Sequence, residues 1–335
     1  MNRLLTSALA AVLLSLPTAC SPAESTQQMA APLLLDGSAY EAALSVKLPE
    51  PRLEELPDLH NVLRLSEQVI SGGEPESVEA LQAIADMGVK TILSVDGKVP
   101  DGRNAEALGL RYVHVPIQYK GITDDELLQI AKTFRELDGP FYVHCFHGQH
   151  RGPAAAAVGR MLLDGVSREQ ALAEMRQWCG TSGKYEGLYG VVALGDIPTA
   201  EQTEAYAYDF PASRQLDGVA GLMVSATRAF DRIVAMRDNA WQVNPDHPDI
   251  DPVNEAAILA SLFTQALELE EVQAGSADYR AQMEDTIARS RALREVVSTL
   301  RADAQAADEH HWAPADAAVA ALKASCNACH VDYRN

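Results

Sequence analysis

The chain has 335 residues, with 27 Lys and Arg against 47 Asp and Glu, and its formal net charge is −20. At roughly 150 residues per domain, this length predicts two domains. Hydrophobic residues make up 47% of the chain, which excludes a mostly disordered protein. The acidic balance excludes a nucleic-acid binder, because few basic groups are available to neutralise a phosphate backbone.

The N-terminus predicts export. A basic start precedes residues 4–16, an uncharged stretch that is short for a membrane span and typical of a signal-peptide core. Residues 17–20 (Pro-Thr-Ala-Cys) resemble a bacterial lipoprotein processing site with Cys20 as the lipid-bearing residue, although proline replaces the usual leucine. We expect a periplasmic protein, either anchored through lipid on Cys20 or cleaved without lipid near Ala19 or Ala23.

The next segment, residues 59–197, alternates between strand and helix patterns. Apolar runs predict strands over 62–65, 69–71, 89–95, 111–117 and 141–146. Helical spacing predicts helices over 77–87, 123–137, 153–163 and 167–178, the second of which opens with a capping box at Thr123. This alternation predicts an α/β domain with a mostly parallel sheet flanked by helices.

A loop between the last expected strand and a helix carries the chemistry. Its backbone N–H groups and the following helix N-terminus converge on one point, which suits an anion. Arg151 stands six residues after Cys145, so its guanidinium can fold back over the loop and bind two oxygens of a tetraoxyanion. The same positive field favours the thiolate of Cys145, which is the nucleophilic form. Gly148 permits the turn.

At these residues the segment resembles the dual-specificity subclass of protein tyrosine phosphatases, which share a signature of His-Cys, five residues and Arg after an apolar strand. The resemblance implies a cysteinyl-phosphate mechanism, in which Cys145 attacks phosphorus, Arg151 stabilises the transition state and water then releases phosphate. The residues that it implies for phosphate binding are Phe146, His147, Gly148, Gln149, His150 and Arg151.

Two positions depart from the family pattern. Gly152 stands where the family has Ser or Thr, and Gln118 or Tyr119 stands where it has an Asp general acid. A general acid is typically worth about 10²–10⁴-fold in rate. Without one, the chain would be a slow enzyme or a phosphate-binding module.

Several side chains are alternatives for the missing acid. Asp124 is the first candidate, but it is equally explained, with Asp125, as a residue of a helix N-terminus. Two further carboxylates, Asp96 and Asp101, follow an earlier strand. His147 and His150 would either replace the acid or add positive charge for a heavily phosphorylated ligand, or else simply pack or face solvent.

Five cysteines are too few to form a disulfide scaffold in a chain of this size. Cys179 is therefore either a buried thiol or the partner of Cys145 in a reversible disulfide that protects a reactive thiolate. A rhodanese-like sulfur transferase also uses a loop cysteine on an α/β sheet. Arg151 and the His144 that precedes the cysteine favour the phosphatase interpretation.

The remaining residues, 212–335, show helical spacing throughout. The pattern predicts helices over 214–239, 251–272 and 278–306, and a last helix that begins at Ala313-Pro314. Four amphipathic helices of this length predict a four-helix bundle.

The last helix ends in the c-type haem attachment signature, with Cys326, Cys329 and His330. Two thiols would bond covalently to the haem while His330 reaches the iron. A zinc site is the alternative, but it needs four ligands and this segment has no second cysteine pair. The spacing therefore predicts one covalent haem c.

The position of this motif resembles the class II cytochromes c, the cytochrome c-prime group. The resemblance implies His330 as the fifth iron ligand and a sixth position set by the first helix. Met223 is the candidate sixth ligand, ahead of Met236, or else a core methionine. A bound Met implies electron transfer, and an open position implies binding of nitric oxide or carbon monoxide.

Together the patterns predict a lipoprotein-like signal peptide over 1–20, a linker over 21–58, a phosphatase-like domain over 59–197, a linker over 198–211 and a cytochrome c-prime-like domain over 212–335. Three functions fit this order. The first is a phosphatase with a haem domain for electron transfer or for redox or gas sensing. The second is an electron-transfer cytochrome whose phosphatase-like domain only binds an anion or partner. The third is a sulfur-transfer protein that uses Cys145.

The partners that follow are a phosphorylated substrate or another anion, a periplasmic redox partner and, through lipid on Cys20, a membrane. Class II cytochromes often dimerise, so a homodimer is also expected, by analogy alone.

Overall fold

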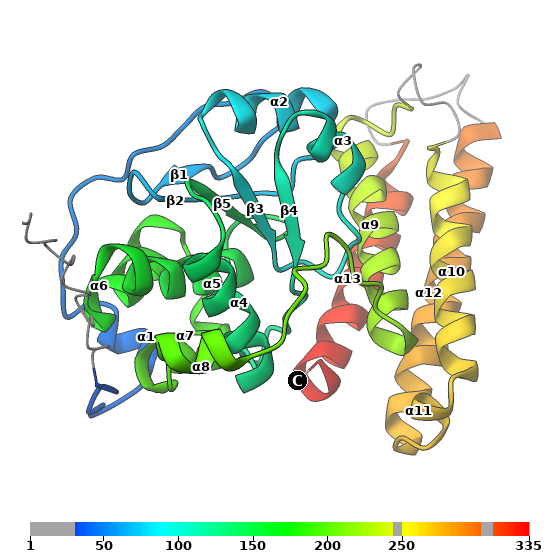
Figure 1. Ribbon diagram of the computed structural model, residues 1–335. Helices are drawn as coiled ribbons and strands as arrows, with labels where there is room; N and C mark the ends of the chain where they lie inside the picture. Colours follow the sequence, from blue (N-terminus) through cyan, green and yellow to red (C-terminus); the bar gives the residue numbers. More distant parts are fainter. Residues whose placement is uncertain (1–30, 244–249, 303–310, 335) are drawn as a thin grey trace, which may run out of the picture.

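The computed structural model describes residues 31–243, 250–302 and 311–334 (Figure 1). The predicted signal peptide and Cys20 lie outside the described residues. Within the described ranges, no helix combines the length and the hydropathy needed to cross a membrane.

The N-terminal part of the described chain is built on a five-stranded sheet with the order β1-β2-β5-β3-β4. The strands are β1 (Leu63–Arg64), β2 (Val69–Gly72), β3 (Thr91–Ser94), β4 (Arg111–His114) and β5 (Phe141–His144). β1 pairs antiparallel with β2, and every other pairing between these strands is parallel. The prediction of a mostly parallel sheet is confirmed.

Helices cover both faces of this sheet (Figure 1). Ile70, Ile92, Tyr112 and Tyr142 point to one face and pack with α2 (Val78–Asp86) and α3 (Gly102–Ala107). Their neighbours in sequence, Val69, Leu93, Val113 and Val143, point to the other face and pack with α4 (Asp124–Glu136), α5 (Arg151–Gly159), α6 (Arg168–Ala173) and α7 (Glu186–Leu194). Burial on both faces explains why these strands are continuously apolar.

Shorter elements complete this domain. α5 and α6 continue as π-helical turns over Arg160–Asp164 and Glu174–Trp178, and a 3₁₀ turn over Gly183–Tyr185 precedes α7. Thr123 and Glu126 form the predicted capping box at the start of α4.

The described part of the first expected linker is not a free tether. It contains α1 (Ala39–Ala42), whose N–H groups at Ala39 and Tyr40 donate to the carboxylate of Glu186. Ala39 and Ala43 are buried in the domain core. A linker was expected over residues 21–58, whereas partners more than a hundred residues away in the sequence hold the described part of it in place.

The second expected linker also packs against the domain. It contains α8 (Ala200–Ala205), with a capping box at Thr199. The carbonyl of the buried Thr203 accepts a 2.7 Å hydrogen bond from Lys132 on α4. Further along, the carbonyl of Pro211 accepts from the amide of His114 on the edge strand β4. This segment therefore attaches the C-terminal helices to the sheet.

The C-terminal part is helical, as predicted. It comprises α9 (Gly218–Asp238), α10 (Pro252–Glu268), α11 (Glu270–Gln273), α12 (Ala277–Ala302) and α13 (Ala313–Tyr333). α10 packs against α9 and α12, and α12 packs against α13, around a shared apolar cluster. The expected helix over 251–272 divides at Leu269, whose extended backbone separates α10 from α11. These contacts are consistent with a helical bundle, and a closed four-helix bundle remains a prediction.

The buried ion pair between Arg160 and Glu174 offers a test of the α/β packing. Both side chains are buried, and Glu174 accepts two 2.9 Å hydrogen bonds from the guanidinium. Replacing Glu174 by Ala leaves a buried cation whose remaining ion-pair partner among the described residues is Asp164. We expect the free energy of unfolding, measured by urea denaturation, to fall by about 3 kcal/mol.

The matched control is the exposed pair between Arg52 and Glu67. Arg52→Ala should change the free energy of unfolding by less than about 0.5 kcal/mol. Equal effects of the two substitutions would contradict this description of the core.

Candidate active site

The loop that carries Cys145 lies at the carboxyl end of the parallel strands. β5 ends at His144 and α5 begins at Arg151, so residues 145–150 form the connection. Gly148 has a φ of 71°, and a Cβ there would lie 2.4 Å from the carbonyl carbon of Gly72. Only glycine fits this close approach, which presses the loop against the end of β2. Cys145 is buried at the base of the loop, with 2% of its surface exposed.

Arg151 folds back toward the loop, as its spacing predicts. Its Nη2 donates to Asp96 Oδ2 at 2.7 Å and to Tyr119 Oη at 3.3 Å. Its Nε is buried and has no hydrogen-bond partner among the described residues. A buried N–H group without an acceptor is costly, and an oxygen of a bound phosphate could supply this acceptor.

Asp96 is the anion that organises the loop. Its Oδ2 also accepts from the amide of Phe146 at 3.0 Å, and its Oδ1 accepts from the amide of Lys98 at 2.9 Å. Burial opposes its ionisation, but Arg151, the Lys98 amide and Arg228 outweigh burial and lower the pKa of Asp96. The carboxylate therefore stays charged and positions Arg151, a role that its place after a buried strand did not reveal.

Two buried histidines support this arrangement. His114 donates from Nε2 to the carbonyl of Asp96 at 2.7 Å and accepts from the amide of Arg214 at its Nδ1. His144 Nε2 lies 2.6 Å from the hydroxyl of Tyr112, and burial lowers the pKa of His144 to about 4. Both rings therefore serve as neutral hydrogen-bonding groups.

The candidate acid Asp124 lies away from these contacts. It is exposed in the first turn of α4, beside the Thr123 cap. Among the described residues, no hydrogen bond or ion pair joins Asp124 to Cys145 or Arg151. Its role as an acid remains a prediction, and from the loop after β4 it is Tyr119 that reaches Arg151.

The two loop histidines differ in environment. His147 is exposed, with its ring 4.3 Å from that of Phe146. His150 is half-buried, accepts from the amide of Ser182 and packs 4.6 Å from the ring of Tyr185. Burial, with smaller contributions from nearby cations, lowers the pKa of His150 to about 4. His150 is thus neutral near pH 7 and adds no positive charge to the loop.

Gly152 and Cys179 lie close to the nucleophile. A Cβ at Gly152 would lie 3.1 Å from the amide nitrogen of Cys145, so a larger residue would require the loop to shift by a few tenths of an ångström. Cys179 is a free thiol in the same apolar cluster as Cys145, and burial raises its pKa. The pairing of these two thiols remains a prediction.

The C-terminal helices contact the loop region from two sides. α9 and α13 face the α/β domain in Figure 1. From α9, Arg228 pairs with Glu74 and lies 3.5 Å from Asp96 Oδ1, with its guanidinium 3.5 Å from the centre of the Phe146 ring. From the end of α13, the guanidinium of Arg334 lies 4.0 Å from the centre of the Tyr119 ring.

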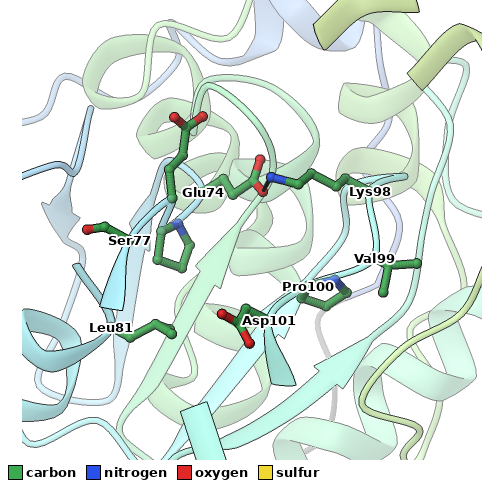
Figure 2. A pocket seen from close by; sticks show the side chains of 9 residues that line it. Glu74, Ser77, Leu81, Lys98, Val99, Pro100 and Asp101 are labelled. Carbon is green, nitrogen blue, oxygen red and sulfur yellow. Dashed lines mark ion pairs between the residues drawn. The ribbon is translucent and has the colours of Figure 1, made fainter. Parts of the chain in front are cut away.

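A pocket of about 220 Å³ lies next to this contact, between the loops that follow β2 and β3. Figure 2 shows its lining, in which Lys98 pairs with Glu74 at 2.6 Å and Asp101 lies at the opposite side. Because Glu74 also pairs with Arg228, the contact with α9 fixes one wall of this pocket.

The predicted haem ligands lie in the last turns of α13. Cys326 and Cys329 are free, partly exposed and three residues apart, so they lie on one face of the helix beside His330. Burial and Arg334 lower the pKa of His330 to about 4. Met223 and Cys326 both pack against the apolar cluster of the helical part. Among the described residues, no group of three or more His, Cys, Asp and Glu is arranged to hold a metal ion.

Two curated proteins match the chain in sequence, and both are the dual specificity protein phosphatase TpbA of Pseudomonas aeruginosa strains. The UCBPP-PA14 protein is 30% identical over 121 residues, which is 35% of this chain and 54% of that protein. The PAO1 protein is 29% identical over 120 residues, 35% of this chain and 53% of that protein. The chain thus spans about half the length of the curated relatives it matches.

Solved structures also match part of the chain. The crystal structure of P. aeruginosa TpbA is 23% identical, with a TM-score of 0.37 over 43% of this chain and 88% of that chain. The core catalytic domain of the PP-IP phosphatase SIW14 from S. cerevisiae is 15% identical, with a TM-score of 0.36 over 42% of this chain and 89% of that chain. No protein-family model matches the chain. The sequence similarity supports a phosphatase-like domain over about 35% of the chain.

The ionised state of Asp96 predicts how stability depends on pH. Its folded pKa lies below the unfolded value of about 3.9, so the carboxylate stabilises the fold above that pH and loses this effect as the pH falls through the folded value. We expect Asp96→Asn to unfold at lower urea than the wild type at neutral pH. The difference should shrink as the pH falls below about 4, and a difference that stays constant would contradict the assignment.

Proposed function

We propose that this chain is an exported haem c protein whose α/β domain hydrolyses a phosphomonoester through a cysteinyl-phosphate intermediate. The observation that carries the proposal is the buried Nε of Arg151, which has no acceptor among the described residues and lies at the start of α5, directly after the loop that carries Cys145. The match to curated dual specificity phosphatases supports the same chemistry.

In the proposed reaction, the Cys145 thiolate attacks phosphorus and the bond to the leaving oxygen breaks. Arg151 and the loop N–H groups bind the oxygens on which negative charge develops. These interactions stabilise the transition state strongly because the site is buried. Asp96 holds the guanidinium of Arg151 in place before substrate binds, so little entropy is lost in ordering this side chain during the reaction. Water then attacks the cysteinyl phosphate and releases inorganic phosphate.

In the helical part, Cys326 and Cys329 would hold a haem c covalently, and His330 would bind its iron. Their free thiols on one helix face fit this group. Met223 would be the second protein ligand to that iron, or else a core methionine. When bound, the haem would supply one-electron transfer or gas binding. A periplasmic redox partner, a lipid anchor on Cys20 and a homodimer belong to the same proposal.

The phosphatase activity is tested with p-nitrophenyl phosphate and the full-length, haem-loaded protein. Cys145→Ser should abolish turnover, because a serine hydroxyl is not ionised at neutral pH. Cys179→Ser is the matched control and should retain activity. Equal turnover by the wild type and Cys145→Ser would contradict a cysteine-dependent mechanism.

The haem assignment is tested by the absorption spectrum of protein produced with c-type haem maturation. Cys326→Ser combined with Cys329→Ser should lose the covalently bound haem, because no thiol remains in the motif to hold it. Cys179→Ser should keep the haem. A denatured double variant that still retains haem would contradict attachment at this motif.

A further inference from the structure

Tyr119 brings a hydroxyl to the phosphate-binding guanidinium. It lies between β4 and α4, and its Oη accepts a 3.3 Å hydrogen bond from Arg151 Nη2. Within the described part of the chain, Oη has no other hydrogen-bond partner. Because the bond from Arg151 uses Oη as an acceptor, the phenolic proton is available to a group bound beside Arg151.

The ring of Tyr119 is held by cations from both parts of the chain. The guanidinium of Arg151 lies 4.4 Å from its centre, and that of Arg334 lies 4.0 Å from it. The ring of Tyr185 packs 4.7 Å away. Two nearby positive charges would stabilise a phenolate formed at Tyr119, whereas burial keeps the hydroxyl protonated before the reaction.

The other polar groups around the loop are less suited than Tyr119 to donate a proton to the leaving oxygen. Asp96 is ionised and already accepts from Arg151 and from the Phe146 amide. His150 is neutral, so it has no readily released proton at neutral pH. Asp124 is exposed in the first turn of α4.

We propose that Tyr119 is the catalytic proton donor to the leaving oxygen and that Arg334, from the end of α13, is a positioning residue for it. This inference rests on the phosphatase activity proposed above. As Cys145 attacks, the phosphorus–oxygen bond breaks and the leaving oxygen takes the proton from Tyr119 Oη. In the second step, the phenolate takes a proton from the water that attacks the cysteinyl phosphate, and Cys145 leaves as the thiolate.

The test compares two esters that differ in their need for protonation. Phenyl phosphate releases a basic phenolate, whereas p-nitrophenyl phosphate releases an anion that leaves unprotonated. With full-length haem-loaded protein, Tyr119→Phe should lower kcat/KM for phenyl phosphate by about 10²-fold or more and change kcat/KM for p-nitrophenyl phosphate little, because kcat/KM reports only the steps up to departure of the leaving oxygen. Tyr185→Phe, which keeps its ring against Tyr119, should leave the ratio of the two rates unchanged.

Arg334→Gln should shift the same ratio in the same direction by a smaller factor, because it removes one of the two cations. Equal loss on both esters in Tyr119→Phe would mean that Tyr119 only supports Arg151, and would overturn the proposal. A wild type that hydrolyses neither ester would instead overturn the phosphatase activity itself. An unchanged ratio in Tyr119→Phe, with both rates intact, would refute only the proton-donor role.

Discussion

The buried ion pair between Asp96 and Arg151 connects every part of the candidate site. The carboxylate comes from the end of β3 and the guanidinium from the start of α5, so the sheet order places them face to face. Asp96 also binds the Phe146 amide within the loop. A buried charge without a partner would cost several kcal/mol, so each residue holds the other in place. The loop geometry thus depends on the parallel pairing of β3 and β5.

This pair also links the two parts of the chain. Arg228 from α9 approaches Asp96 and packs over Phe146, while Arg334 from α13 packs over Tyr119. His114 connects the backbone of Asp96 to that of Arg214, just before α9. The proposed haem-binding residues end at His330, four residues before Arg334, so this end of α13 also carries the side chain that packs on Tyr119.

The sequence predicted the features that depend on local pattern. The alternation of strands and helices, the capping box at Thr123 and the loop from Cys145 to Arg151 follow from periodicity and spacing, and the structure has all three. Asp96 was recognised as a polar residue after a buried strand, but its pairing with Arg151 requires the order of strands in the sheet, which spacing does not specify.

The parts that the sequence missed depend on contacts between distant residues. Residues 33–49 resembled a linker because their backbone partners, such as Glu186 and Gln177, lie far away in the chain. Tyr119 was noted only as a departure from a family pattern. Its contact with Arg334 joins the α/β domain to the end of α13 and has no local signature.

The most direct test of the account is mass spectrometry of the full-length haem-loaded protein, quenched with acid during turnover of p-nitrophenyl phosphate. The account predicts a phosphate group on the peptide that contains Cys145, and its absence when the substrate is omitted. Continued turnover with Cys145 unmodified at every quench time, or a phosphate group on another residue, would contradict a cysteinyl-phosphate mechanism in this chain.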